Sequence, residues 1–116
     1  MPPVQEISVD VFAEKLKSKD DFVVLDVREP SELEGARIQD SRVVVAPMSV
    51  LGSKGIGGLP DAAQDKDAEL LILCHHGTRS AQVAGWLAAK GWTRAFSVSG
   101  GIDEYARRID SSVGSY

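Results

Sequence analysis

The chain has 116 residues, of which 43% are hydrophobic and 26% are charged. These values are ordinary for a single globular domain, and we expect one domain over residues 1–116. Its formal net charge of −4 argues against nucleic acid as a direct partner, and its apolar runs are too short to cross a membrane. A single cysteine excludes an internal disulfide, and without a visible secretory signal the sequence indicates a cytoplasmic protein.

The first half of the chain predicts two short helices and two strands. Ser8 is a typical N-cap residue and precedes apolar residues at helical spacing. The apolar, β-branched run over residues 22–27 predicts a buried strand. Pro30 then opens a short polar helix over residues 30–34, and residues 42–45 form a second strand candidate.

The segment from Ala46 to Pro60 is rich in glycine and proline. This composition predicts a surface loop with at most a turn of helix. The glycine spacing matches neither the dinucleotide-binding pattern nor the phosphate-loop pattern, and no strong strand leads into it. The segment is therefore interpreted as a connector.

The second half alternates strands and helices. Leu70–Leu73 is the clearest buried strand, and Ser80–Lys90 follows as an amphipathic helix that Gly91 ends. Residues 95–98 predict a last strand and residues 101–109 a last helix. This alternation predicts right-handed crossovers, and hence an α/β fold with a mostly parallel sheet and helices on both faces.

The segment from Cys74 to Ser80 joins the best strand to the best helix, where open α/β sheets bind ligands. A tight loop entering a helix points free backbone N–H groups inward, and such a nest stabilises a thiolate over a thiol. Gly77 lets the backbone turn, Arg79 adds a permanent positive charge, and Ser80 is placed to cap the helix. Cys74 is thus a candidate nucleophile, although a lone cysteine at a strand end is usually an inert buried residue.

Other polar residues of this region leave alternatives open. His75 and His76 are interpreted as solvated loop residues that tune the local charge, because adjacent side chains rarely converge on one metal ion. Arg79 either binds substrate anions or pairs with Asp26 or Glu29 to hold the loop in shape. Asp26 ends a buried strand, which favours a structural role over acid catalysis.

Four short motifs together resemble the single-domain rhodanese-like sulfurtransferase family. The order Cys-x-x-Gly-x-Arg-Ser over residues 74–80 resembles the family's active-site loop. Asp-Val-Arg-Glu-Pro over residues 26–30 resembles its first motif, Gly35–Ile38 stands where the family often has Gly-His-Ile, and Gly-Gly-Ile over residues 100–102 matches its late motif. The resemblance covers almost the whole chain. It implies a three-layer α/β sandwich around a mostly parallel five-stranded sheet.

The resemblance also implies an activity without a cofactor or a metal. Cys74 would take sulfane sulfur from a small donor such as thiosulfate or a persulfide, hold it as a persulfide, and pass it to a thiol, cyanide or a sulfur-accepting protein. The residues carried over as substrate-binding are His75, His76, Gly77, Thr78 and Arg79. Asp26, Glu29 and Ser80 would support the loop.

Two other functions compete with sulfur transfer. Non-catalytic binding modules related to rhodaneses commonly lack the cysteine that this chain has. Related phosphatases and arsenate reductases use a loop one residue longer, because a tetrahedral oxyanion needs a wider cradle than a single sulfur atom; here four residues separate Cys74 from Arg79. Two departures from the family pattern, Arg37 for a common His and Tyr105 for a common Trp, lie outside this loop.

Overall fold

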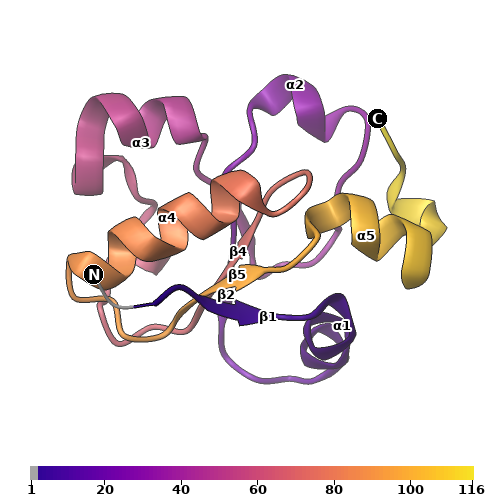
Figure 1. The fold of residues 1–116 in the computed structure, drawn as a ribbon, viewed down its shortest axis with the longest axis horizontal. Coiled ribbons are helices and arrows are strands. Elements are labelled where there is room, and N and C mark those ends of the chain that lie inside the picture. Colours follow the sequence, from indigo (N-terminus) through magenta and orange to yellow (C-terminus); the bar gives the residue numbers. More distant parts are fainter. Residues whose placement is uncertain (1–2) are drawn as a thin grey trace.

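A five-stranded sheet in the order β1-β5-β4-β2-β3 forms the centre of the protein in a computed structural model that describes residues 3–116 (Figure 1). Every neighbouring pair of strands is parallel, which confirms the predicted α/β fold class. The strands are β1 (Gln5–Ile7), β2 (Val23–Asp26), β3 (Val43–Val45), β4 (Leu70–Leu73) and β5 (Ala95–Val98).

Helices cover both faces of the sheet and give the fold three layers. They are α1 (Val9–Lys17), α2 (Pro30–Leu33), α3 (Met48–Lys54), α4 (Thr78–Ala89) and α5 (Gly101–Arg108). The fully buried strand β4 shows the two sides, because side chains alternate along a strand. Leu70 and Ile72 pack in a core with residues of α3 and α4, whereas Leu71 and Leu73 pack in a second core with residues of α1 and α5. None of the helices within residues 3–116 combines the length and the hydrophobicity that crossing a membrane requires.

Several local predictions are confirmed. The side chain of Ser8 accepts a hydrogen bond from the backbone N–H of Val11 at 3.2 Å and caps α1. Strands β4 and β5 have the predicted bounds. Gly91 follows the last residues of α4 with φ +108°, the left-handed conformation expected of a glycine just beyond a helix end.

Three features differ from the sequence predictions. Strand β1 was not predicted, and it pairs with β5 at the edge of the sheet. The segment interpreted as a loop contains the seven-residue helix α3, which forms because Leu51 becomes buried, leaving 4% of its surface exposed. The N-cap residue of α4 is Gly77 and not Ser80, because the helix begins two residues earlier than predicted.

Candidate active site

Cys74 lies at the carboxyl end of β4, a strand with neighbours on both sides, where the chain turns into α4. The turn depends on Gly77, whose φ of +101° is rarely adopted by residues with a side chain. A Cβ atom on Gly77 would also lie 3.0 Å from the backbone nitrogen of Gly100. Backbone conformation and close packing therefore both require glycine at this position.

The sulfur atom of Cys74 accepts two backbone hydrogen bonds from its own loop. The N–H of Gly77 donates to Sγ at 3.1 Å and the N–H of Ser80 donates at 3.3 Å. Cys74 is 1% exposed, so these donors act where little water competes with them. Fixed backbone donors and the start of a helix are both arrangements that can accommodate a negatively charged group.

Two buried hydroxyl groups, those of Ser80 and Ser97, lie next to one another beside the sulfur of Cys74. The hydroxyl oxygen of Ser80 accepts from the thiol of Cys74 at 3.4 Å, and the same hydroxyl donates to the carbonyl of Gly77 at 3.1 Å. The hydroxyl of Ser97, which comes from β5, lies 2.8 Å from the hydroxyl of Ser80. Both serines are fully buried. Ser80 thus binds the sulfur through its backbone and contacts it through its side chain.

The amino end of α5 holds the other side of the loop. The N–H of Ile102 donates to the carbonyl of Cys74 at 2.9 Å, and the N–H of Asp103 donates to the carbonyl of His75 at 3.0 Å. Gly101 makes this contact possible, since a Cβ there would lie 2.5 Å from the carbonyl oxygen of Cys74 and closer still to that of His75. The Gly-Gly-Ile motif therefore fixes the loop by letting two backbones touch.

Arg79 is paired with a carboxylate that the sequence did not identify. Its guanidinium donates to both oxygens of Glu32 on α2, each at 2.7 Å. The pairing with Asp26 or Glu29 that we considered from the sequence is wrong. Those two residues are engaged elsewhere, since Asp26 accepts from Arg28 and Glu29 accepts from Ser49.

Glu32 is strongly stabilised in its charged form. The hydrogen bonds from Arg79 are the largest cause, and together with the hydroxyl of Tyr116 at 2.7 Å and the N–H of Glu29 at 3.3 Å they lower the pKa of Glu32 to about 2, although partial burial opposes the change. Arg79 and Glu32 thereby tie the first turn of α4 to α2. This contact fixes one side of the loop that carries Cys74.

A buried ion pair lies beneath α2. The guanidinium of Arg28 donates to the two oxygens of Asp26 at 3.0 and 2.8 Å and to the carbonyl of Ala36 at 2.8 Å. Asp26 is 1% exposed and Arg28 is fully buried. Because the two charges compensate each other, the geometry favours a structural role for Asp26.

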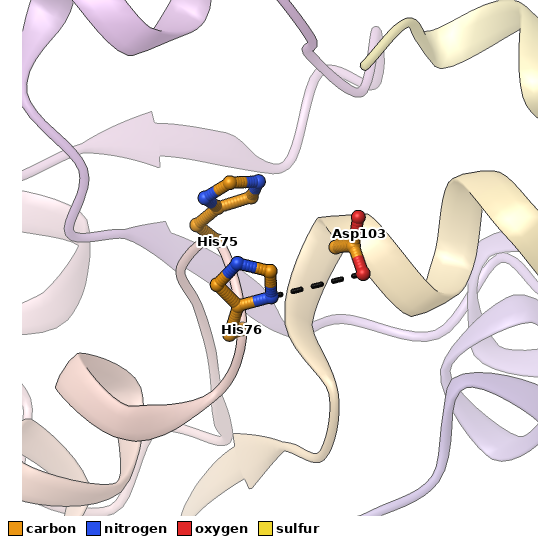
Figure 2. Close-up of side chains that lie close together, drawn as sticks. All are labelled: His75, His76 and Asp103. Carbon is orange, nitrogen blue, oxygen red and sulfur yellow. Dashed lines mark ion pairs between the residues drawn. The ribbon is translucent and has the colours of Figure 1, made fainter. Parts of the chain in front are cut away.

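The two histidines of the loop differ in their surroundings (Figure 2). His76 is exposed, as expected, and its Nδ1 lies 3.7 Å from a carboxylate oxygen of Asp103. His75 is half-buried and stacks on the ring of Tyr116, with the ring centres 3.9 Å apart. Burial, and then the neighbouring His76, lower the pKa of His75, which favours its neutral form at neutral pH.

His75, His76 and Asp103 also place potential metal-ligand atoms within 4.8 Å of one another. Adjacent histidines therefore do converge here, contrary to the sequence expectation. The carboxylate of Asp103 is at the same time bound by Arg107 at 3.1 Å, and the ring of His75 is held between two aromatic neighbours. Because these groups already have partners within the protein, the cluster is better explained as compensating charges at the edge of the loop than as a metal site.

Three residues of the site were missed by the sequence reasoning. They are Glu32, Ser97 and Tyr116, and each comes from an element distant in sequence from the loop. Ser97 alone had a visible signal, since it is a polar residue within a predicted strand. Thr78, predicted to bind substrate, is the exposed first residue of α4.

Comparisons with known proteins agree with this geometry. The family model described as rhodanese-like domain matches residues 8–108. The chain is 31% identical over 119 residues to the rhodanese-like/PpiC domain-containing protein 12, chloroplastic, of Arabidopsis thaliana; the match covers 98% of this chain but spans only 38% of that protein. It is 29% identical over 104 residues to a sulfurtransferase of Allochromatium vinosum, covering 90% of each. The crystal structure of a rhodanese-related protein from Thermoplasma volcanium superposes with a TM-score of 0.71 at 28% identity, covering 90% of this chain and 93% of the other.

Proposed function

We propose that this chain, which belongs to the rhodanese-like domain family, is a sulfurtransferase that carries sulfane sulfur as a persulfide on Cys74. One observation carries the proposal. The sulfur of Cys74 accepts hydrogen bonds from the N–H groups of Gly77 and Ser80 at the end of a central strand. Such an arrangement supports a thiolate nucleophile at Sγ.

The reaction proceeds in two displacements without net oxidation. In the first, the Cys74 thiolate attacks the outer sulfur of thiosulfate. A new S–S bond forms, and the old one breaks as sulfite leaves with the bonding electron pair. In the second, a thiolate or cyanide attacks the outer sulfur of the persulfide, and the Cys74 thiolate leaves with its electron pair. The protein thus returns to its starting state.

The length of the loop supports sulfur over an oxyanion as the transferred group. Four residues separate Cys74 from Arg79, and the donors to the sulfur come from within that short turn and its first helical residues. A loop of this size suits one terminal sulfur atom, whereas the phosphatase and arsenate reductase chemistry considered from the sequence uses a longer loop. We assign Arg79 to holding the loop, because both of its terminal nitrogens donate to the carboxylate of Glu32.

The remaining assignments follow from the same loop. His75, His76 and Thr78 belong to the loop that follows Cys74 and would contact a small donor, either thiosulfate or a persulfide. The acceptor would be a thiol, cyanide or a sulfur-accepting protein. A free thiol as the single cysteine fits a reducing compartment such as the cytoplasm.

The proposal is tested by Cys74→Ser. We expect the wild-type protein to turn over thiosulfate and cyanide and to gain the mass of one sulfur atom after treatment with thiosulfate alone. The variant should lose both properties while its thermal unfolding stays close to that of wild type, because serine is similar in size. A folded variant that keeps substantial turnover would contradict the assignment. A wild-type protein that neither turns over nor gains sulfur would instead favour a non-catalytic binding module.

A further inference from the structure

Ser97 carries a buried hydroxyl on a strand face that is otherwise apolar. Side chains alternate along β5, so Ser97 shares a face with Ala95, which packs in the core with α4. A fully buried hydroxyl costs free energy unless it is hydrogen-bonded. Within residues 3–116, this hydroxyl makes a hydrogen bond to Ser80 alone, at 2.8 Å. The hydroxyl of Ser97 is therefore placed for an interaction with Ser80 and not for packing.

Ser80 has one hydroxyl proton and three polar neighbours. The carbonyl of Gly77, 3.1 Å away, can only accept a hydrogen bond. The thiol of Cys74, 3.4 Å away, can donate to the oxygen of Ser80. The hydroxyl of Ser97 can donate to that oxygen as well. In the thiol state all groups are satisfied when Cys74 and Ser97 donate to Ser80, and Ser80 donates to Gly77.

Loss of the thiol proton changes what the sulfur requires. A thiolate is an acceptor only, so it no longer donates to the hydroxyl oxygen of Ser80. The hydroxyl of Ser80 can then turn its proton from the carbonyl of Gly77 to the sulfur, adding a third donor to the two fixed N–H groups. Ser97 continues to donate to Ser80 and polarises it, which strengthens the bond that Ser80 makes to the charged sulfur.

We propose that Ser97 is a positioning residue for the sulfur of Cys74, acting through the hydroxyl of Ser80. The pair forms a hydrogen-bond switch that follows the charge on the sulfur. The proton that leaves the thiol goes to solvent, while Ser80 and Ser97 keep their own protons and only the direction of the Ser80 hydroxyl changes. The proposal deepens the function assigned to Cys74 and needs no group from outside the chain.

Alkylation by iodoacetamide over a range of pH tests the switch, because it reports the charge state of the sulfur without requiring sulfur transfer. In Ser97→Ala we expect the pH of half-maximal alkylation to rise by about 0.5 unit or more, since the thiolate loses the support of a polarised donor. We expect kcat/KM for sulfur transfer to fall about three- to tenfold. Ser53→Ala removes an exposed hydroxyl that bonds a carbonyl of its own helix α3, and this control should leave both values unchanged.

Repeating the experiment in a Ser80→Ala protein separates an action of Ser97 through Ser80 from a general effect on the fold. Ser80→Ala should raise the alkylation midpoint by itself, and adding Ser97→Ala to it should change the midpoint no further. Equal shifts from Ser97→Ala in both backgrounds would overturn the proposal, as would a wild-type midpoint in a folded Ser97→Ala protein. A sulfur that alkylates as expected in a protein without transferase activity would leave the switch standing and refute the proposed function alone.

Discussion

Replacing Arg79 with alanine removes both short hydrogen bonds that Glu32 accepts from it. Glu32 then keeps its charge beside only the hydroxyl of Tyr116 and the N–H of Glu29. The fall in the pKa of Glu32 from 4.5 to about 2 corresponds to about 3 kcal/mol in favour of the charged carboxylate. The two side chains are 31% and 20% exposed, so water screens part of this energy, and we expect Arg79→Ala to lower the free energy of unfolding by about 1–2 kcal/mol.

Thermal unfolding measured together with the KM for thiosulfate provides the assay. For a chain of this length, the expected loss lowers Tm by about 4–10 °C at neutral pH. Arg107→Ala is a suitable control, because it breaks an exposed pair with Asp103 one helical turn away and should cost less than about 0.5 kcal/mol. Wild-type melting combined with a raised KM would refute the structural role of Arg79 and show that it binds the donor.

The pH dependence of the stability loss tests whether Glu32 is the partner through which Arg79 stabilises the fold. Because the pKa of Glu32 is lower in the folded protein than in the unfolded chain, its contribution to stability is fully present above pH 4.5 and is lost as the pH falls towards 2. The difference in Tm between wild type and Arg79→Ala should therefore shrink below pH 4.5. A difference that stays constant down to pH 2 would mean that Arg79 stabilises the fold through some other contact.

Two further substitutions probe the supports of the loop. Gly101→Ala places a Cβ against the carbonyl oxygens of Cys74 and His75 at a φ of +62°, so we expect lower stability and a loss of sulfur transfer. The control Gly52→Ala, where a Cβ would meet no heavy atom within 4 Å, should be neutral or stabilising. Equal effects of the two substitutions on Tm would contradict the close contact at Gly101. Arg28→Met leaves the buried charge of Asp26 without its partner and should cost about 3–5 kcal/mol in denaturant unfolding, less when combined with Asp26→Leu. If the double variant loses as much free energy of unfolding as Arg28→Met alone, the shape of the pair matters more than its charge.

Features that depend on neighbours along the chain could be predicted from the sequence. The bounds of β4, the N-cap at Ser8 and the helix stop at Gly91 follow from local periodicity, capping and a positive φ. The loop after Cys74 also belongs to this group, because a strand, a glycine and a helix start in that order place N–H groups around the sulfur wherever the loop sits. The sequence therefore predicted a loop whose N–H groups surround the sulfur of Cys74, and in the structure the donors are Gly77 and Ser80.

Features that join distant segments were decided by the tertiary structure. Strand β1 has two exposed residues and one half-buried residue, too few for a periodic pattern, and it is fixed by pairing with β5. Helix α3 contains and precedes glycines that disfavour a helix, yet burying Leu51 in the core outweighs their preference.

The site shows the same division between local and long-range information. Glu32 is 47 positions from Arg79, and the partners considered from the sequence were Asp26 and Glu29 near the end of β2. Ser97 is 17 positions from Ser80 and meets it only because β5 lies beside β4 in the sheet. A sequence pattern reports which groups a segment carries, whereas the order of the strands and the direction of each side chain determine which groups meet.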